Sequence, residues 1–252
     1  YFELLSFYTL SSDRRFLCNK KGYDSERNFA MIEVRNFSKE IKGKLILDHV
    51  NCSFEPGKVY GLMGVNGSGK TMLMRAIAGL ILPSEGSVLI DGHELGHDSS
   101  SFPDGTGILI ENPSFIDSYT GFKNLKLLAS IQKKITDEQI EVALEKVGLD
   151  PHDNRKYRKY SLGMKQKLGI AAAVMEMPKI VILDEPLNAL DDDGIQRVHK
   201  IISELKENGA TIIIACHDKE ELISMTDIIY KIENGKLVGK EENGNEKSED
   251  SF

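Results

Sequence analysis

The chain has 252 residues, of which 40% are hydrophobic and 28% charged, a composition typical of a globular protein with one large or two small domains. Its net charge of −7 disfavours a general nucleic-acid-binding protein, which usually carries a basic face, so we expect no nucleic-acid partner. Three cysteines without a CxxC pair disfavour a disulfide framework, and no apolar run approaches the ~20 residues needed to cross a bilayer.

The two ends of the chain differ in character from its middle. Residues 1–30 show no clear periodicity, and the strand-like segment "MIEVRNF" begins directly after them. We therefore expect residues 1–30 to be an extension outside the fold and residues 31–238 to form the folded domain. Residues 239–252 are polar and acidic, which predicts a flexible tail.

Strands and helices alternate between these two ends. The apolar run "KVYGLMG" is followed by a segment with helical spacing at Leu73, Ile77 and Leu80. Further along, "KIVILDEP" and "ATIIIACHD" are continuous apolar runs, typical of strands that are buried on both faces. The helix predicted between them should end at Gly209. This alternation predicts βαβ units and a mostly parallel sheet.

The stretch from about 114 to 165 departs from this alternation because it is rich in helical patterns and has no buried strand. Within it, "TDEQIEVALEKVG" begins with a capping box formed by Thr136 and Gln139, and Gly148 should end the helix. We therefore expect a helical subdomain inserted in an α/β core.

The segment "GVNGSGKT" matches the phosphate-binding pattern G-x4-G-K-[ST] and lies between a predicted strand and a predicted helix. Gly67 and Gly69 lack a Cβ atom, so backbone N–H groups can converge on phosphate oxygens beside the helix N-terminus. Lys70 would place its charge on the β- and γ-phosphates, and the Thr71 hydroxyl would ligate Mg²⁺. A glycine-rich structural turn is the alternative, but it would not need the Lys-Thr pair. The predicted nucleotide-binding residues of this segment are Gly64, Asn66, Gly67, Ser68, Gly69, Lys70, Thr71 and Met72.

Two acidic residues end the buried strand "KIVILDEP". Asp184 stands where a carboxylate can hold Mg²⁺ through water, and Glu185 can accept a proton from an attacking water. The alternative is a strand that simply ends in a polar turn. The phosphate-binding segment earlier in the same parallel-sheet pattern favours the metal site.

Together with further segments in the same order, these motifs make residues 31–238 resemble the ATP-binding subunits of ABC transporters. "YSLGMKQ" resembles the signature usually written LSGGQ and matches it at Ser161 and Gly163, "NALD" resembles the D-loop, and His217 matches the switch histidine. The resemblance implies a P-loop NTPase of the ABC type, with a mostly parallel sheet core, an antiparallel β-edge and an inserted helical subdomain. For His217 the alternative is a packed histidine at a strand end.

The resemblance also implies ligands, partners and a location. ATP and Mg²⁺ would bind, and two subunits, identical or related, would enclose ATP between the P-loop of one and Ser161 and Gly163 of the other. His217 would contact the γ-phosphate and orient both the attacking water and Glu185. The subunit would work with a transmembrane permease, so the chain would be cytoplasmic and peripheral on the inner face of the cell membrane.

Two positions depart from the family's pattern. An aromatic residue usually stacks on adenine where the alignment places Ile41, so an aliphatic contact would replace stacking. A glutamine usually follows the strand "GILI", where this chain has Glu111. A carboxylate binds Mg²⁺ more strongly than an amide, so Glu111 is a predicted catalytic and metal-binding residue, with a solvated strand end as the alternative. This glutamate, with "YSLGMKQKLGIA" and "DEPLNALD", resembles exporters that protect bacteria from bacitracin and lantibiotic peptides.

Two other functions remain as alternatives. One is a regulatory module that binds ATP with little turnover, which the intact Asp184, Glu185 and His217 disfavour. The other is a non-transport ATPase of the same family, which the acidic charge disfavours where the target is a nucleic acid. His93 and His97 have i,i+4 spacing in a predicted loop, but a metal site would need further ligands and a helix.

Overall fold

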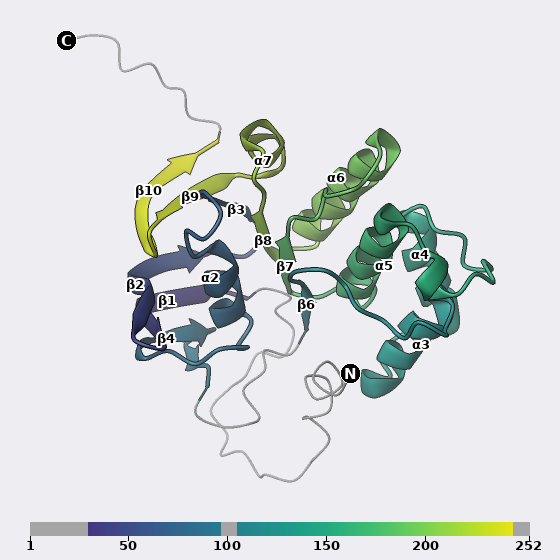
Figure 1. Cartoon of the computed structure of the whole chain (residues 1–252), viewed down its shortest axis with the longest axis horizontal. Helices are drawn as coiled ribbons and strands as arrows, with labels where there is room; N and C mark the ends of the chain where they lie inside the picture. The colour runs from purple at the N-terminus through teal and green to yellow at the C-terminus, as the bar shows by residue number, and fades with distance from the viewer. Residues whose placement is uncertain (1–29, 97–104, 244–252) are drawn as a thin grey trace.

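The computed structural model describes residues 30–96 and 105–243 of the chain, and two sheets form its framework (Figure 1). The larger sheet has the strand order β10-β9-β3-β8-β7-β6. Its strands are β3 (Val59–Met63), β6 (Thr106–Leu109), β7 (Ile180–Asp184), β8 (Thr211–Ala215), β9 (Ile228–Glu233) and β10 (Lys236–Glu242). All neighbouring pairs are parallel except β9 and β10. The predicted mostly parallel core is therefore confirmed.

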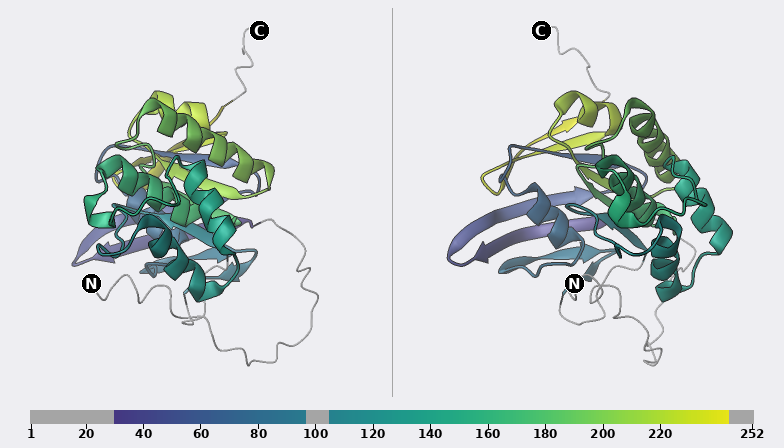
Figure 2. Two further views of the ribbon diagram at one scale, coloured as in Figure 1. Left: turned by 90° about the vertical axis from the view of Figure 1, so that its right-hand side faces the viewer. Right: turned by 45° about the vertical axis from the view of Figure 1, so that its right-hand side comes forward.

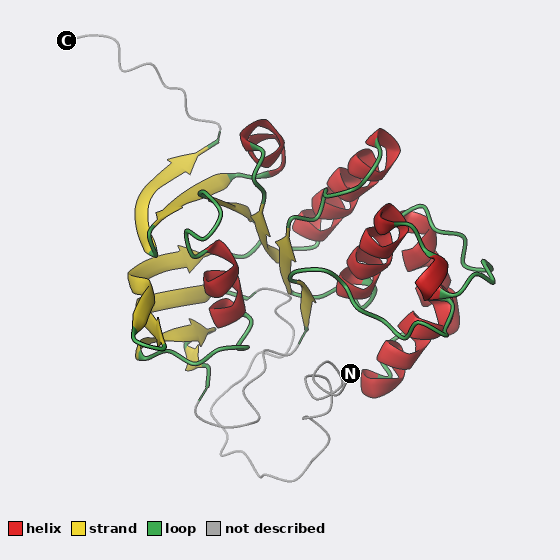
Figure 3. Cartoon of the chain, in the orientation of Figure 1, coloured by secondary structure: helices red, strands yellow, loops and turns green. Residues whose placement is uncertain are grey.

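The smaller sheet is antiparallel and has the order β2-β1-β4-β5. Its strands are β1 (Ile32–Ile41), β2 (Lys44–Phe54), β4 (Glu85–Ile90) and β5 (His93–Glu94). The predicted antiparallel edge is thus a sheet of its own, and it lies beside α2 at one side of the molecule (Figures 1 and 3).

The helices cover both sides of the larger sheet. They are α2 (Lys70–Ile77), α3 (Gly121–Gln132), α4 (Asp137–Lys146), α5 (Leu162–Val174), α6 (Asp192–Glu207) and α7 (Lys219–Met225), with a 3-10 turn at Tyr157–Lys159. Helices α3, α4 and α5 gather away from the antiparallel sheet, as the turned views show (Figure 2). The predicted helical stretch contains α3, α4 and the 3-10 turn, whereas α5 begins near its end and continues into the core. Among the described helices, none has the length and apolar character needed to cross a membrane.

The central strands are apolar throughout because both of their faces are covered. In β7, Val181 and Leu183 belong to the core cluster formed with α3 to α6, and Ile180 and Ile182 belong to the cluster on the opposite face, with α2 and the smaller sheet. Alternate side chains of a strand point to opposite faces, so a strand between two layers needs an unbroken apolar run.

The ends of the helices follow the predicted stop signals with one exception. Gly148 and Gly209, with φ of 78° and 84°, directly follow the C-cap residues of α4 and α6, so both helices stop where predicted. The capping box is also present, with the Thr136 N–H donating to the Gln139 side chain over 2.9 Å. The prediction that α2 includes Leu80 is wrong, because the helix ends at Ile77 and Gly79 then turns with a φ of 73°.

The boundaries of the fold differ from the predicted ones by a few residues. Ala30 is buried, and its carbonyl accepts a hydrogen bond from Thr211 Oγ1 over 2.5 Å. The prediction of a flexible tail is wrong for residues 239–242, because β10 continues to Glu242 and pairs there with β9. His93 forms part of β5 and not a loop. Residues 1–29, 244–252 and His97 lie outside the described residues.

Candidate active site

Four neighbouring parallel strands bring the predicted P-loop, Asp184, Glu185, His217 and Glu111 to one edge of the larger sheet. The strands β3, β8, β7 and β6 are adjacent and parallel, so their carboxyl ends meet at the same edge. The P-loop follows β3, His217 follows β8, Asp184 ends β7 with Glu185 directly after it, and Glu111 follows β6. Ligands of open α/β proteins bind at this edge.

In the P-loop, residues 64–71, Gly69 and Gly64 are required for different reasons. Gly69 has a φ of 113°, a conformation that residues with a Cβ atom rarely adopt. Gly64 is closely packed, since a Cβ atom there would lie 2.3 Å from the Ile232 carbonyl oxygen. The first constraint sets the turn into α2, and the second brings the start of the P-loop against β9.

The turn between β9 and β10 supports the P-loop from outside. The Gly235 N–H donates to the Ser68 carbonyl over 2.8 Å, and the Gly235 carbonyl accepts from the Asp48 N–H over 2.9 Å. A Cβ atom at Gly235 would lie 2.3 Å from the Ile46 carbonyl oxygen. The P-loop is therefore held between β2 and the last hairpin of the fold.

Two polar side chains of the P-loop have the chemistry that a phosphate requires. The Lys70 ammonium is buried and donates to the Gly64 carbonyl over 2.6 Å, with the Val65 carbonyl at 3.4 Å. Ser68 Oγ is also buried, and no described residue offers it a hydrogen-bond partner. A buried hydroxyl without a partner is unusual, and a cation beside it suits an oxyanion. The remaining predicted residues, Asn66 and Gly67, are exposed.

Thr71 and Asp184 form the oxygen pair expected of a magnesium site. Thr71 Oγ1 donates to Asp184 Oδ2 over 2.7 Å, joining the first turn of α2 to the end of β7. Burial raises the pKa of Asp184, while the Thr71 hydrogen bond opposes this shift. A hydroxyl and a carboxylate oxygen are hard ligands that suit Mg²⁺, so these two residues fit the ion that the fold implies.

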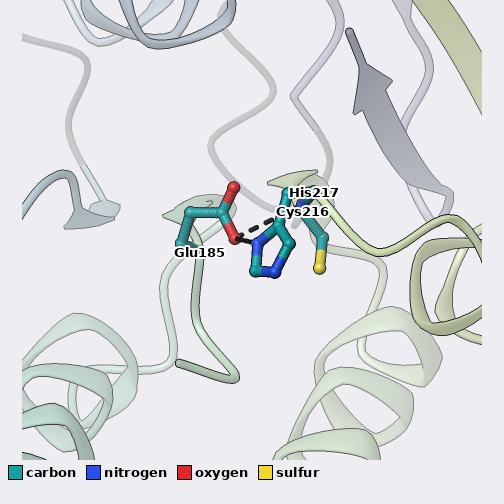
Figure 4. Close-up of side chains that lie close together, drawn as sticks. All are labelled: Glu185, Cys216 and His217. Atoms are coloured by element: carbon teal, nitrogen blue, oxygen red, sulfur yellow. Dashed lines mark hydrogen bonds and ion pairs between the residues drawn. The ribbon is translucent and has the colours of Figure 1, made fainter. Parts of the chain in front are cut away.

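Glu185 and His217 are paired across the ends of β7 and β8 (Figure 4). Glu185 Oε2 lies 2.7 Å from His217 Nδ1, and the His217 N–H donates to the same carboxylate oxygen over 3.3 Å. The hydrogen bond to Glu185 raises the pKa of the His217 imidazole. The Glu185 backbone has a φ of 51°, and its N–H donates to the Ala215 carbonyl over 2.8 Å. The structure thus brings together the predicted base and the predicted switch histidine.

Helix α5 connects the signature segment to the loop that follows β7. Ser161 caps α5, and its Oγ accepts from the Met164 N–H over 3.2 Å, while its side chain stays exposed. Gly163 packs so closely that a Cβ atom would lie 2.6 Å from the Ala189 carbonyl oxygen. The sequence reasoning missed Gln166, whose buried amide donates to the Glu185 carbonyl over 2.9 Å. The only indication of this contact in the sequence was that Gln166 is the last residue of the signature-like segment "YSLGMKQ".

Glu111 has a left-handed backbone conformation that the sequence did not predict. The strand β6 ends at Leu109, and Glu111 follows with a φ of 62°. Its carboxylate Oε1 lies 2.5 Å from Arg75 Nη2 on α2, and its side chain is 61% exposed. The sequence reasoning missed Arg75, although its i,i+4 spacing from Thr71 places both on one face of α2.

Ile41 and Met72 lie at the margin of the site. Ile41 ends β1 at the tip of the β1–β2 hairpin, and it is 39% exposed. From this tip β2 returns along the P-loop, where the Leu47 side chain lies 2.9 Å from the position of a Cβ atom at Gly69. Met72 is partly buried and packs against the core cluster of α2. The adenine contact predicted for Ile41 stays a prediction.

The comparison with protein families places this geometry in a known group. The model described as "ABC transporter" matches residues 47–188, more than half of the chain. The chain belongs to the ABC transporter family. The ATP-binding domains of this family hydrolyse ATP, form dimers and work with transmembrane permease components.

Several relatives of the chain are ABC transporter ATP-binding proteins. The chain is 48% identical to the uncharacterized ABC transporter ATP-binding protein YybJ of Bacillus subtilis, with 84% of this chain and 96% of that protein covered. It is 38% identical to the bacitracin transport ATP-binding protein BcrA of Enterococcus faecalis, with 82% and 68% covered. It is 36% identical to the lantibiotic transport ATP-binding protein SrtF of Streptococcus pyogenes, with 88% and 96% covered.

A solved structure supports the same fold. The ATP-binding subunit of an ABC transporter superposes with a TM-score of 0.77 at 25% identity, covering 84% of this chain and 90% of the other. The predicted ABC-type fold and the resemblance to bacitracin and lantibiotic transport subunits are thus confirmed. The roles of the individual site residues stay predictions.

Proposed function

We propose that this chain binds ATP with Mg²⁺ at its P-loop and hydrolyses it to power an exporter of antimicrobial peptides. One observation carries the proposal. The Thr71–Asp184 pair joins α2 to the end of β7, and the Glu185–His217 pair joins the residues after β7 and β8, each over 2.7 Å. Both pairs lie at the edge of the sheet that also bears the P-loop. This arrangement supplies, in one place, an oxygen pair for a metal and a carboxylate for proton transfer.

The P-loop residues bind the triphosphate. Lys70 exchanges its two backbone carbonyl partners for phosphate oxygens, and Ser68 Oγ gains the hydrogen-bond partner that it lacks among the described residues. The N-terminus of α2 adds its backbone N–H groups and a favourable dipole. A bound phosphate would thus satisfy the buried Ser68 hydroxyl and pair with the Lys70 charge.

Thr71 and Asp184 would hold Mg²⁺, which neutralises charge on the β- and γ-phosphates when it is bound. Glu111 is our proposed additional ligand. To reach the metal site, its carboxylate must leave Arg75, and the loss of such a solvent-accessible ion pair costs only ~0.2–1 kcal/mol. Arg75 therefore holds Glu111 beside the site without locking it.

Glu185 accepts the proton of the attacking water in this proposal. Its backbone is fixed on both sides, by the Ala215 carbonyl and by the Gln166 amide. His217 orients the carboxylate through Nδ1 and presents its remaining ring nitrogen to the γ-phosphate. These contacts keep the Glu185 carboxylate in a fixed position toward the attacking water during the reaction.

A second subunit completes the site. Ser161 and Gly163 at the start of α5 would contact the γ-phosphate bound to the partner's P-loop, where the helix N-terminus favours an anion. The exposed Ser161 side chain supports this role. Because Gln166 of the same helix holds the Glu185 backbone, one helix would serve the nucleotide of the partner and the base of its own subunit.

The substrate and the location come from the relatives. BcrA and SrtF are named for bacitracin and lantibiotic transport, so we propose export of such a peptide. The chain would then lie on the cytoplasmic face of the membrane, held there by its permease and paired with a second ATP-binding subunit. The proposal excludes nucleic acid as a partner.

The test uses the chain together with its permease in a bacterium sensitive to bacitracin and lantibiotics. We expect the wild-type pair to raise resistance and membranes containing it to release phosphate from ATP, with both effects lost in Lys70→Ala. Phosphate release without resistance to either peptide would overturn the substrate class alone. No phosphate release above background, with the permease present, would overturn the ATPase and favour a regulatory module.

A further inference from the structure

Cys216 lies near the pair of Glu185 and His217 and is a third side chain of a type that can ligate a metal. One ligand atom from each of the three residues can be chosen so that all lie within 4.8 Å of one another. In Figure 4 the imidazole is drawn between the carboxylate and the thiol. The nucleotide chemistry proposed above uses Glu185 and His217 but gives the thiol no task. The mixture of sulfur, nitrogen and oxygen atoms therefore points to a ligand other than the nucleotide.

The three ligand types match a thiophilic ion better than Mg²⁺. Thiolate and imidazole are preferred by Zn²⁺ and Cd²⁺, whereas Mg²⁺ prefers oxygen and keeps several waters. A tetrahedral zinc site with bonds of ~2.0–2.3 Å separates its ligand atoms by about 3.3–3.8 Å. The widest separation in the cluster, at most 4.8 Å, has to shorten by about 1 Å, whereas the Glu185–His217 pair, now 2.7 Å apart, has to open slightly. Rotation of the side chains can supply both changes.

The exposure of two of the three side chains suits such a rearrangement. Cys216 is only 3% exposed and directly follows β8, so its sulfur is the fixed point of the cluster. The His217 side chain is 65% exposed, and that of Glu185 is 23% exposed, so both can turn toward the sulfur. Glu221 Oε2 lies 3.7 Å from Cys216 Sγ and offers a further oxygen ligand.

We propose that Glu185, Cys216 and His217 form an inhibitory site for a thiophilic divalent cation, Zn²⁺ or Cd²⁺. Binding replaces the hydrogen bond between Glu185 and His217 with metal–ligand bonds, and the thiol proton is released to solvent. The P-loop stays free, so ATP still binds while its hydrolysis stops. Only this inhibitory consequence rests on the proposed ATPase, because the cation binds to the folded chain whether or not hydrolysis occurs.

The first experiment measures binding without using activity. In a Cys18→Ser/Cys52→Ser background, Cys216 is the single remaining thiol. We expect Cd²⁺ to produce a thiolate-to-cadmium absorption band in the ultraviolet that saturates at one ion per chain. Adding Cys216→Ser should remove the band and weaken Zn²⁺ binding, measured by competition with a chromophoric chelator, by more than the ~10–100-fold typical of an outer-shell loss.

The second experiment measures inhibition, with Cys52→Ser as the matched control. This cysteine lies on β2 and is not part of the cluster. We expect micromolar Zn²⁺ to inhibit phosphate release by the wild type and by Cys52→Ser, but to inhibit Cys216→Ser and Cys216→Ala at least tenfold less. The Cys216 variants should keep their basal phosphate release.

Three results would overturn the inference. They are the absence of the absorption band when Cys216 is the only cysteine, wild-type Zn²⁺ affinity in both Cys216 variants, and unchanged Zn²⁺ inhibition in those variants. Failure of the proposed function looks different, because an inactive chain would still bind Cd²⁺ through Cys216. Comparing Ser with Ala at this buried position separates loss of a ligand from loss of packing, since circular dichroism reports whether each variant folds.

Discussion

Two glutamates follow neighbouring parallel strands in the same unusual backbone conformation, yet they are held very differently. Glu185 after β7 and Glu111 after β6 have φ of 51° and 62°. The backbone of Glu185 is hydrogen-bonded on both sides, and its carboxylate pairs with His217. Among the described residues, Glu111 pairs with one side chain, that of the half-buried Arg75. A left-handed glutamate costs energy, and we propose that both positions are functional, one with a fixed backbone and the other with a side chain that changes partners.

We infer that the two glutamates have different roles at the edge of the sheet. A proton acceptor must keep its geometry through the reaction, and the supports of Glu185 provide this. A residue that reports whether metal and nucleotide are present must change partners, and an ion pair worth ~0.2–1 kcal/mol permits that. The following predictions test this contrast.

Removing the proposed base should have the largest effect. Glu185→Gln keeps the shape of the side chain but cannot accept a proton, so we expect phosphate release to slow by roughly 10²–10⁴. ATP affinity, measured with a fluorescent ATP analogue, should be unchanged. Turnover close to that of the wild type would reject Glu185 as the base.

The metal-binding pair should come next. Thr71→Val removes the hydroxyl that donates to Asp184, so we expect Mg²⁺-dependent phosphate release to fall by about 10–100-fold, the range typical of a disturbed metal site. Thr71→Ser, which restores the hydroxyl, is the matched control and should stay within a few-fold of the wild type. Equal losses in both variants would point to packing of α2 instead of a metal ligand.

Glu111 and Arg75 should give smaller effects of opposite sign. Glu111→Gln should raise the Mg²⁺ concentration needed for half-maximal phosphate release, because a carboxylate ligand is lost. Arg75→Gln should lower it, because the carboxylate becomes free to move to the metal. An exposed ion pair limits the latter shift to about fivefold. If Mg²⁺ dependence and coupling to the permease both stay at wild-type values in the two variants, Glu111 is only a solvated strand end.

The smallest effect concerns the ionisation of His217. Since Glu185 raises the pKa of His217, the NMR titration of its ring protons should shift to lower pH in Glu185→Gln. The same linkage fixes the sign of its contribution to stability. The pair stabilises the fold fully below the ordinary histidine pKa, and this stabilisation is lost as the pH rises through the raised value. An unchanged titration would contradict the pairing of these side chains.

Much of the fold could be predicted from the sequence because its signals are local. The apolar runs at β7 and β8 and the glycines after α4 and α6 each determine their own segment, and the P-loop pattern locates the site. The end of β10 was not predictable in the same way. Its residues alternate between exposed and half-buried, so they read as a polar tail until β9 supplies their partners.

The contacts that support the site residues could not be predicted from local sequence patterns either. Arg75 and Gln166 act on residues that are distant along the chain, Glu111 and Glu185, and no spacing rule joins these pairs. Such partners depend on how α2 and α5 pack against the sheet, which only the three-dimensional structure reveals. The type of the site was therefore predictable, whereas the difference in freedom between its two glutamates was not.

The turn at Gly235 has a consequence for the order in which the protein is made. Its N–H supports the Ser68 carbonyl in a P-loop that the ribosome completes far earlier in synthesis. A nascent chain that stops short of the β9–β10 hairpin carries the whole phosphate-binding motif but lacks the brace that holds it in shape. Unfinished or truncated chains would therefore compete poorly for ATP, so the ability to bind nucleotide would be acquired only when the last hairpin closes.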